Sequence, residues 1–488
     1  MPVSHAVGVS PAGRDGEAAV HFTINARGVD LQAAAPPLGY PVIDNDHGFH
    51  LPRHRAGAEA QPGFQRLLKD LCYDSRFQPL IVECRDERLR AKLIPRRRVP
   101  GGTNRELPYQ RNQPSPDCRN PEVRPMSTHT IEEPGLLLHP GPPGNWDDER
   151  VSGPRVLRQA DGIWLLWYYG RDRSFDRQVG LPTGRIGLAR SEDGLNWQRV
   201  AGPGTRGAVL DPHPDPRRFD STHVGVGSVT RDETGFRLWY FGGDEERFRF
   251  GRFEVKGLRL RIGCARSTDG IQWQRIDGPH RGALLDVGPP GAFDQATCGW
   301  PRVLRLPDGR WRMYYHGLDP ERMQFAIGAA ESDDGLAWQR LGEIFGSGEP
   351  GAFDETGVTL PELLPPGQHG GSDWRMLYQG VCRDGHRSIG LAASPDGLYW
   401  SRVPGAEPGG AVFAHAPSGS GRWDAFAVGT PCVVPMPDGR FRLYYSGADE
   451  VPSGFADELA MVQQIGLAIS DGADLTRWRR WERGGDGD

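Results

Sequence analysis

RIGLARSEDGLNW, residues 185–197, is the first of five copies of one pattern, Ile-Gly-x-Ala followed by Ser-x-Asp-Gly-x-x-Trp. The other copies are RIGCARSTDGIQW (261–273), AIGAAESDDGLAW (326–338), SIGLAASPDGLYW (388–400) and the degenerate QIGLAISDGADLTRW (464–478). They recur at intervals of about 62 to 76 residues, which suits a small sheet with variable loops and not a helical repeat. Five copies therefore predict five similar modules.

Two further elements recur upstream of each copy. The first is an aromatic residue followed by Asp, with a Pro downstream in four of the five units; these pairs are Trp146-Asp147, Phe219-Asp220, Phe293-Asp294, Phe353-Asp354 and Trp423-Asp424. The second is an aromatic run: WLLWYYG (164–170), FRLWYFG (236–242), WRMYYHG (311–317), WRMLYQG (374–380) and FRLYYSG (441–447). Aromatic and aliphatic runs bounded by Asp-Gly turns are typical of strands.

Each unit is thus predicted to hold four strands. The first follows the aromatic-Asp pair, the second is the aromatic run, the third contains Ile-Gly-x-Ala, and the fourth begins at the Trp. One such sheet cannot bury both of its faces alone, whereas five sheets arranged around an axis can. The predicted fold is all-β, a five-bladed β-propeller with four-stranded blades.

A short apolar segment predicts how the ring closes. GAVL (207–210), GALL (282–285), GEIF (342–345) and GAVF (410–413) follow the first four Trp strands, but the fifth unit lacks a counterpart. GLLL (135–138) stands unpaired before the first unit. We expect this segment to pair with the strand that contains Trp478 and so to join the two ends of the propeller.

Composition fits this fold and limits the function. Gly (67) and Pro (43) together are about twice their usual share of a 488-residue chain, as many tight turns require. A net charge of −5 gives no overall attraction to nucleic acid or anionic membrane, and no apolar run is long enough to span a bilayer. The start lacks the pattern of a secretory signal, so a cytoplasmic location is expected. The seven Cys form no C-x-x-C pair, and we expect no metal site.

Residues 1–125 carry no repeat. They combine Pro-rich stretches with a basic cluster over residues 85–98, and we predict a disordered N-terminal extension, with the propeller over residues 126–488. Because Met126 immediately precedes the repeats, a start that lies too far upstream is the alternative.

With these motifs, the region of about 135–481 resembles the five-bladed propellers of the arabinanase, levansucrase and invertase superfamily, which includes glycoside hydrolase families 32, 43 and 130. The resemblance implies hydrolysis or transfer of a glycoside, a saccharide partner, no cofactor, and carboxylates that converge on an axial funnel. In those families the acids lie one or two residues before the first-strand Pro. Here those positions hold Ser152 and Gly153, Gly225 and Val226, Gly299 and Trp300, Thr359 and Leu360, and Gly429 and Thr430. A propeller that binds glycan or protein without catalysis therefore stays open as the alternative.

Comparison of equivalent positions in the five units indicates candidate site residues. The Asp of the aromatic-Asp pair is present in all five units and is expected to be structural, as is the Asp of the Ser-x-Asp-Gly turn. Residues that differ between equivalent positions are free to serve the funnel. The predicted catalytic carboxylates are Asp148, Glu149, Glu355 and Glu362. The predicted substrate-binding residues are Arg155, His223, Gln295, Trp300, Arg302 and His316. The sequence sets no oligomeric state.

Overall fold

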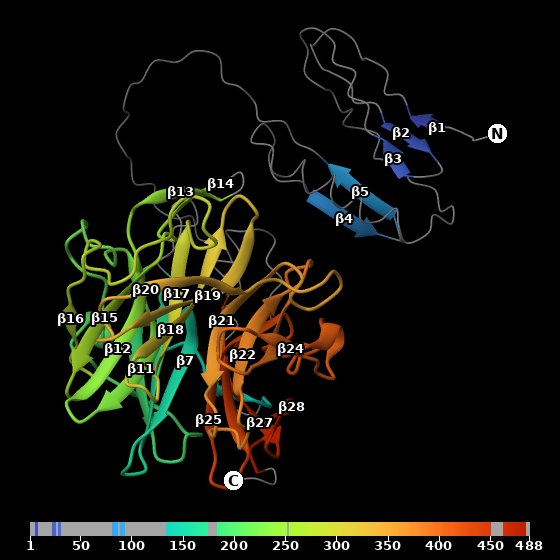
Figure 1. The fold of residues 1–488 in the computed structure, drawn as a ribbon. Helices are drawn as coiled ribbons and strands as arrows, with labels where there is room; N and C mark the ends of the chain where they lie inside the picture. Colours follow the sequence, from blue (N-terminus) through green and yellow to red (C-terminus); the bar gives the residue numbers. More distant parts are fainter. Residues whose placement is uncertain are drawn as a thin grey trace, which may run out of the picture. The chain divides into compact units, whose positions relative to one another are not determined.

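A computed structural model describes residues 133–173, 183–250, 253–449 and 462–484, together with five short strands nearer the N-terminus. The chain divides into two compact units, Met1–Val123 and Arg124–Asp488, which are described separately (Figure 1). In the first unit, the strands are β1 (His5–Val7), β2 (Phe22–Asn25) and β3 (Gly28–Asp30) in one antiparallel sheet, and β4 (Ile81–Arg85) and β5 (Arg88–Lys92) in a hairpin. The rest of residues 1–125 lies outside the described residues, and its predicted disorder stays a prediction.

The strands of the repeat region form successive sets of four antiparallel strands; the first two sets are separate sheets, and the last three belong, with β6 (Leu136–Leu138), to one 13-stranded sheet. The first has β7 (Arg150–Arg158), β8 (Trp164–Arg171), β9 (Gly184–Ser191) and β10 (Gln198–Val200). The second has β11 (His223–Asp232), β12 (Gly235–Gly243), β15 (Arg261–Ser267) and β16 (Gln274–Ile276), with the inserted hairpin of β13 (Arg247–Phe250) and β14 (Phe253–Lys256).

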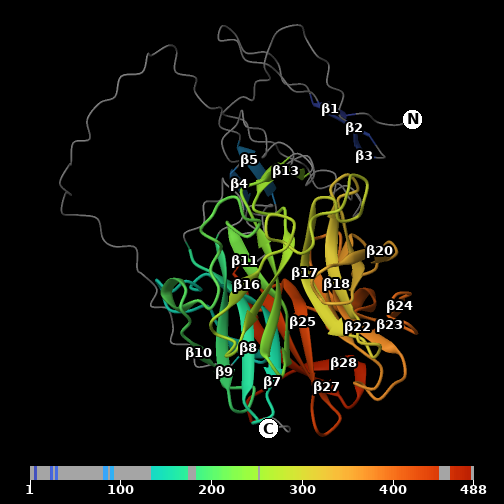
Figure 2. The same cartoon turned by 60° about the vertical axis from the view of Figure 1, so that its left-hand side comes forward.

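The third, fourth and fifth units repeat this order. Their strands are β17 (Thr297–Arg305), β18 (Trp311–Asp319), β19 (Gln324–Ser332) and β20 (Gln339–Phe345); β21 (Gly357–Leu364), β22 (Trp374–Val381), β23 (Arg387–Ser394) and β24 (Ser401–Val403); and β25 (Ala427–Pro435), β26 (Phe441–Ala448), β27 (Gln464–Asp471) and β28 (Asp474–Arg480). The expected all-β class and the four-strand order within each unit are confirmed. Figure 2 shows the first unit as neighbouring strands from β10 to β7.

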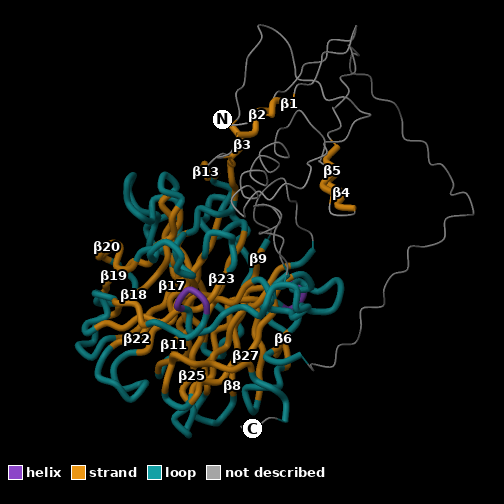
Figure 3. Tube along the Cα trace, turned by 90° about the vertical axis from the view of Figure 1, so that its right-hand side faces the viewer, coloured by secondary structure: helices purple, strands orange, loops and turns teal. Residues whose placement is uncertain are grey.

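Helical structure is minor in the described part of the chain. It comprises two single 3-10 turns, Thr205–Gly207 and Pro408–Gly410, and Figure 3 shows strands and loops nearly throughout. Within the same residues, no helix has the length and apolar character needed to cross a membrane.

The first strands of the five units lie next to one another. β7 contacts β11, β11 contacts β17, β17 contacts β21, and β21 contacts β25. β25 in turn contacts β7, so the last unit meets the first. This succession brings the variable residues of all five first strands to one region.

The apolar segment ahead of the first unit joins the fifth unit, but not at the expected strand. β6 (Leu136–Leu138) pairs with β27, through Leu138 opposite Ile465, whereas Trp478 lies in β28. The edge of β27 is shared, since β28 occupies residues 468–471 and leaves 465–466 for β6. The corresponding segments of other units bridge their own third strands in the same way, at Leu210, Leu285 and Phe413. The expected partner was therefore wrong by one strand.

The Asp of each aromatic-Asp pair holds the unit together. Asp354 is fully buried, and its Oδ2 accepts hydrogen bonds from Tyr378 Oη at 2.9 Å and from Arg402 Nε at 2.8 Å. The same Asp–Tyr–Arg set recurs as Asp147, Tyr168 and Arg199; Asp220, Tyr240 and Arg275; Asp294, Tyr315 and Arg340; and Asp424, Tyr445 and Arg480. A fivefold-repeated buried contact confirms the structural role predicted for this Asp.

The Ser-x-Asp-Gly turns link neighbouring units. In the first turn, Asp193 Oδ1 accepts backbone N–H groups of Leu195 and Asn196, both at 2.8 Å. The Gly carbonyl of a turn accepts a hydrogen bond from the aromatic run of the preceding unit. These bonds are Trp167 Nε1 to Gly270 (2.9 Å), Trp239 Nε1 to Gly335 (3.1 Å) and Tyr314 Oη to Gly397 (3.0 Å). Tyr444 Oη donates to the Gly194 carbonyl at 2.9 Å and so joins the fifth unit to the first.

Candidate functional site

The first strand of every unit contains a bulge, where the pairing register shifts. In the four units that have a Pro there, the residue preceding that Pro has a positive φ. These residues are Gly153, Trp300, Leu360 and Thr430, with φ of 61°, 49°, 55° and 49°. Such a φ is disfavoured for a bulky residue and is commonly kept where a site uses the resulting side-chain direction.

Trp300 is the centre of an aromatic group. Its ring stacks on Phe241 with centroids 3.8 Å apart and on His316 at 5.1 Å, and Tyr169 lies 6.3 Å from Phe241. A Cβ placed on Gly153 would lie 3.8 Å from Trp300 Nε1, so the first unit faces the indole of the third. Trp300 is partly exposed, whereas the other three aromatic side chains are buried. Part of the Trp300 side chain is therefore accessible to solvent.

In the fourth and fifth units, small polar side chains occupy the equivalent part of the first and second strands. Gln379 Nε2 donates to Thr359 Oγ1 at 3.1 Å, and the Thr430 and Ser446 hydroxyls lie 2.5 Å apart. The N–H of Gly153 donates to Ser446 Oγ at 2.9 Å, which ties the fifth unit to the first. The first three units thus contribute aromatic side chains to this region, and the fourth and fifth contribute hydroxyl and amide groups.

The sixth position of the aromatic run was the sequence signal that could have revealed these residues. The fifth position is Tyr in every unit, but the sixth is Tyr169, Phe241, His316, Gln379 and Ser446 in turn. Each of these pairs across the sheet with the residue two before the Pro, or with its counterpart in the second unit. Phe241, Thr430 and Ser446 were not among the predicted site residues.

Two buried histidines at this end of the sheets are neutral at pH 7. Burial lowers the pKa of His223 to about 3, with the positive charge of Arg171 adding to the effect, and burial alone lowers the pKa of His316 to about 3. Neither ring nitrogen of His223, nor Nδ1 of His316, has a hydrogen-bond partner among the described residues. The rings therefore carry buried polar atoms that a ligand could satisfy.

Buried arginines lie beside these rings. Arg150 stands opposite Arg171 in the β7–β8 pairing, and both are buried. Burial holds the pKa of Arg150 well below its usual range, and the charges of Arg171 and Arg387 lower it further. The Glu149 carboxylate opposes this effect on both Arg150 and Arg171. The predicted acid Glu149 thus lies within electrostatic reach of a strongly positive group.

Asp148, Glu355 and Gln295 make one equivalent contact in three units. The side chain of each accepts the backbone N–H of the glycine four residues earlier, at 2.7, 3.0 and 2.9 Å. Asp148 also accepts the N–H of Arg173, and Glu355 that of Arg383, each at 3.1 Å. Since an uncharged Gln fills the same role, these contacts favour a structural function for both carboxylates.

The pKa of Glu355 is also unsuited to a general acid. The backbone N–H groups of Gly351 and Arg383 stabilise its ionised form and hold the pKa below the ordinary value. A carboxyl group that donates a proton to a leaving oxygen needs a raised pKa.

Glu362 and Arg302, which follow the Pro in their units, form a buried ion pair. Arg302 Nε lies 2.7 Å from Glu362 Oε2, and Nη2 donates to Oε1 at 2.9 Å. The N–H of Val433 also donates to Oε1, at 3.2 Å, and the glutamate side chain is 2% exposed. Both oxygens are therefore engaged within the protein.

Arg155 occupies the same position in the first unit. It donates to the carbonyls of Pro431, at 3.0 Å, and of Gly227, so it bridges the fifth and second units. Burial, together with the charge of Arg302, lowers the pKa of Arg155 to about 10, while Glu362 opposes the shift. Arg155, Arg302 and Glu362 thus form a buried layer that connects units.

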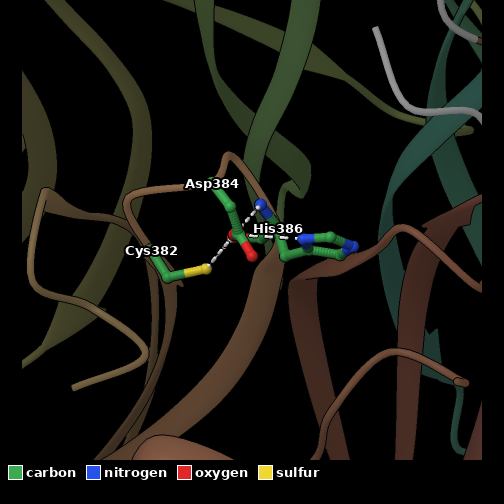
Figure 4. A group of neighbouring side chains, drawn as sticks. All are labelled: Cys382, Asp384 and His386. Atoms are coloured by element: carbon green, nitrogen blue, oxygen red, sulfur yellow. Dashed lines mark hydrogen bonds and ion pairs between the residues drawn. The ribbon is translucent and has the colours of Figure 1, made fainter. Parts of the chain in front are cut away.

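One group of metal-ligand side chains is present among the described residues. Cys382, Asp384 and His386 place a sulfur, a carboxylate oxygen and a ring nitrogen within 4.8 Å of one another (Figure 4). The sequence offered the signal Cys-x-Asp-x-His, which an expectation based on C-x-x-C pairs did not consider.

Comparison with known proteins supports the fold. No family model matches the chain. "Uncharacterized protein Rv1502" and "Uncharacterized protein MT1551", from two strains of Mycobacterium tuberculosis, are each 29% identical over 257 residues, or 52% of this chain and 74% of the relative. Two solved structures, a BT0996 RGII complex and one named "Glycoside hydrolase", match with a TM-score of 0.50 and 18% identity; they cover 70% of this chain and 92% and 91% of their own. The repeat region therefore has the propeller fold of such glycoside hydrolases, as the sequence motifs indicated.

Proposed function

We propose that the protein binds a carbohydrate at the centre of a five-bladed propeller formed by residues 126–488. The observation that carries this proposal is the partly exposed side chain of Trp300, flanked by His316, together with the polar side chains that the fourth and fifth units carry at equivalent positions. A pyranose ring has an apolar face that stacks on an indole and hydroxyls that hydrogen-bond to amides and hydroxyls. A neutral His223 adds a donor and an acceptor beside them.

The five units and the contact of β25 with β7 support the five-bladed count. The cytoplasmic location expected from the sequence is part of the same proposal. So is the boundary at residue 126: a chain that begins at Met126 should melt within a few degrees of the full chain. Insolubility of the shorter chain would contradict that boundary.

The test is saccharide binding by a Trp300→Gly variant. Glycine is the residue of the first unit at this position and accepts the positive φ, so the backbone should keep its course while the stacking surface is lost. Affinity for a saccharide found by a melting-temperature screen should fall about tenfold or more. Tyr399→Ala, at an aromatic residue that is 78% exposed, is the control and should leave affinity unchanged. Equal affinity in both variants would reject the site.

The second candidate is hydrolysis or transfer of a glycoside by the predicted acids Asp148, Glu149, Glu355 and Glu362. Glu149 favours it, since its side chain is partly exposed and lies near Arg150 and Arg171. Of the four, Asp148, Glu355 and Glu362 have oxygens engaged by backbone N–H groups or by Arg302. If the chain is an enzyme, Glu149→Gln should abolish turnover of an aryl glycoside while saccharide binding persists. Wild-type protein that binds saccharide but turns over no glycoside would leave binding as the function.

A further inference from the structure

Three potential metal ligands share the short loop between β22 and β23. Figure 4 shows Asp384 between Cys382 and His386. Cys382 Sγ donates to Asp384 Oδ1 at 2.6 Å, and the same oxygen lies 3.0 Å from His386 Nδ1. All three ligand atoms lie within 4.8 Å of one another. The loop thus gathers one soft and two harder donors at one point.

The backbone of this loop fixes the arrangement. The N–H of Cys382 donates to the carbonyl of His386 at 3.1 Å, so these residues face each other at the base of the turn. Asp384 Oδ1 accepts the N–H of His386 at 3.1 Å, and Gly385 takes the left-handed conformation, with φ of 89°, that the return of the chain requires. The close approach therefore follows from the fold of the hairpin and needs no long-range contact.

Two rings pack against the imidazole of His386. The ring of His386 stacks on His415 with centroids 4.5 Å apart and lies 4.9 Å from the ring of Phe426. Its Nε2 lies 3.0 Å from Ser418 Oγ. When Nε2–H donates to that hydroxyl, the lone pair of Nδ1 faces Asp384 and Cys382. A metal-binding histidine is commonly oriented in this way by a hydrogen bond at its other nitrogen.

Nδ1 of His386 supplies the observation that points to a ligand. This atom is buried and makes no hydrogen bond with the described residues, and Asp384 Oδ1 lies 3.0 Å away, which is an ion pair when the ring is protonated. A nitrogen lone pair and a carboxylate that face each other need a proton or a cation between them. A metal ion would satisfy both atoms and the sulfur together.

We propose that Cys382, Asp384 and His386 bind a divalent transition metal of the Zn²⁺ type. Thiolate, imidazole and carboxylate are the three ligand types that Zn²⁺ takes, with water in a remaining tetrahedral position. Bond lengths of about 2.0 to 2.3 Å place neighbouring ligands about 3.3 to 3.8 Å apart. The Sγ–Oδ1 separation must then open by about 1 Å, and the thiol proton leaves to solvent as the sulfur–metal bond forms. This site is independent of the proposed saccharide site.

The test is metal binding by the untagged, reduced full-length chain. Equilibrium dialysis should find one Zn²⁺ per chain that Cys382→Ser and His386→Gln each weaken by about 100-fold or more. His369→Gln is the matched control, because His369 lies in another loop of the same unit and bonds the Asp373 carbonyl at 2.7 Å. That variant should bind as tightly as the wild type.

A second measurement guards against variants that misfold. Co²⁺ added to the wild-type chain should produce the near-ultraviolet charge-transfer band of a cobalt thiolate, and Asp384→Asn should weaken its formation while leaving the melting temperature of the metal-free chain unchanged. Failure of the wild-type chain to bind either metal would overturn the proposal. Binding of unchanged tightness in both Cys382→Ser and His386→Gln would do the same.

Discussion

Replacing Asp354 with Asn should expose how strongly the Asp–Tyr–Arg contact stabilises one unit. The carboxylate is fully buried and accepts two hydrogen bonds, from Tyr378 and from Arg402. Burial, together with the charge of Asp354, raises the pKa of Tyr378, so its hydroxyl stays protonated and acts as a donor throughout the range in which the fold is studied. Asparagine keeps the size of the side chain but removes its charge and half of its acceptor capacity.

The two lost interactions set the magnitude. The Tyr378 hydroxyl, which is buried, loses a charged acceptor, at a cost of about 1.5 to 3 kcal/mol. Arg402 loses its ion pair, but its side chain is 36% exposed, and solvent limits that loss to about 1 kcal/mol. The free energy of unfolding should therefore fall by about 3 kcal/mol. Tyr378→Phe keeps the ion pair and should cost about 1 to 2 kcal/mol.

Urea unfolding followed by fluorescence and by circular dichroism measures these differences, compared at equal m-values. Asp333→Asn is the control, because Asp333 is exposed, and its effect should stay within about 0.5 kcal/mol. The double variant Asp354→Asn, Tyr378→Phe should cost less than the sum of the single changes, since both remove the same hydrogen bond. An Asp354→Asn loss no larger than that of the control would refute the structural role of the repeated Asp.

Three other changes test the junction between units, a buried histidine and the central ion pair. Tyr444→Phe should lower the melting temperature and cost about 1 to 2 kcal/mol, because the Gly194 carbonyl of the first unit loses its donor; an unchanged melting curve would argue against that junction. The pKa of His223 is lowered to about 3 from an ordinary value near 6.5, so between these values the unfolded chain binds one proton more than the folded chain. The stability contributed by neutral His223 should therefore be complete above pH 6.5 and fall toward pH 3 by at most about 1.4 kcal/mol per pH unit. His223→Gln should flatten this slope in urea midpoints measured from pH 7 to pH 5. Glu362→Ala should cost about 3 to 5 kcal/mol by leaving Arg302 buried without its partner, whereas the double change Glu362→Leu, Arg302→Met should be close to neutral; equal losses in both would show that the pair itself stabilises the fold.

The sequence predicted the strands well because their signals are local and repeated. Each aromatic run lies within the second strand of its unit, and each Ile-Gly-x-Ala lies in the third. The invariant Asp of the aromatic-Asp pair also revealed its own role, since a residue kept in every unit serves what every unit shares. Asp354 and its four counterparts make the same buried contacts.

The sequence pattern could not identify the strand with which residues 135–138 pair. The third and fourth strands of the fifth unit, β27 and β28, were the two candidates, and the choice depends on how much of the β27 edge β28 leaves uncovered. The degenerate fifth copy, which carries two extra residues before its Trp, gave no measure of that length.

The contacts of the predicted acids could not be predicted from the sequence either, because residue type does not tell where a carboxylate points. Asp148 and Glu355 looked like free acids, yet they receive the same backbone N–H groups as Gln295. That equivalence was visible in the alignment of the units, in which an amide occupies the same position. The spacing Cys-x-Asp-x-His was a local signal for the metal-ligand group, whereas the stacking of His415 on His386 comes from outside that hairpin and could not be predicted.

The aromatic run explains how one scaffold keeps its stability while its centre varies. Successive side chains of a strand point to opposite faces, so the fifth position of the run, always Tyr, faces its Asp, and the fourth and sixth share the other face. The fourth position bonds the next unit, as Trp167 bonds Gly270, and the sixth contacts the next unit near the bulge, as Phe241 contacts Trp300. A change at the sixth position therefore alters the centre without touching the buried Asp–Tyr–Arg contacts. The sixth position changes chemical class from unit to unit, from Tyr169 to Ser446, while the fifth stays Tyr in every unit.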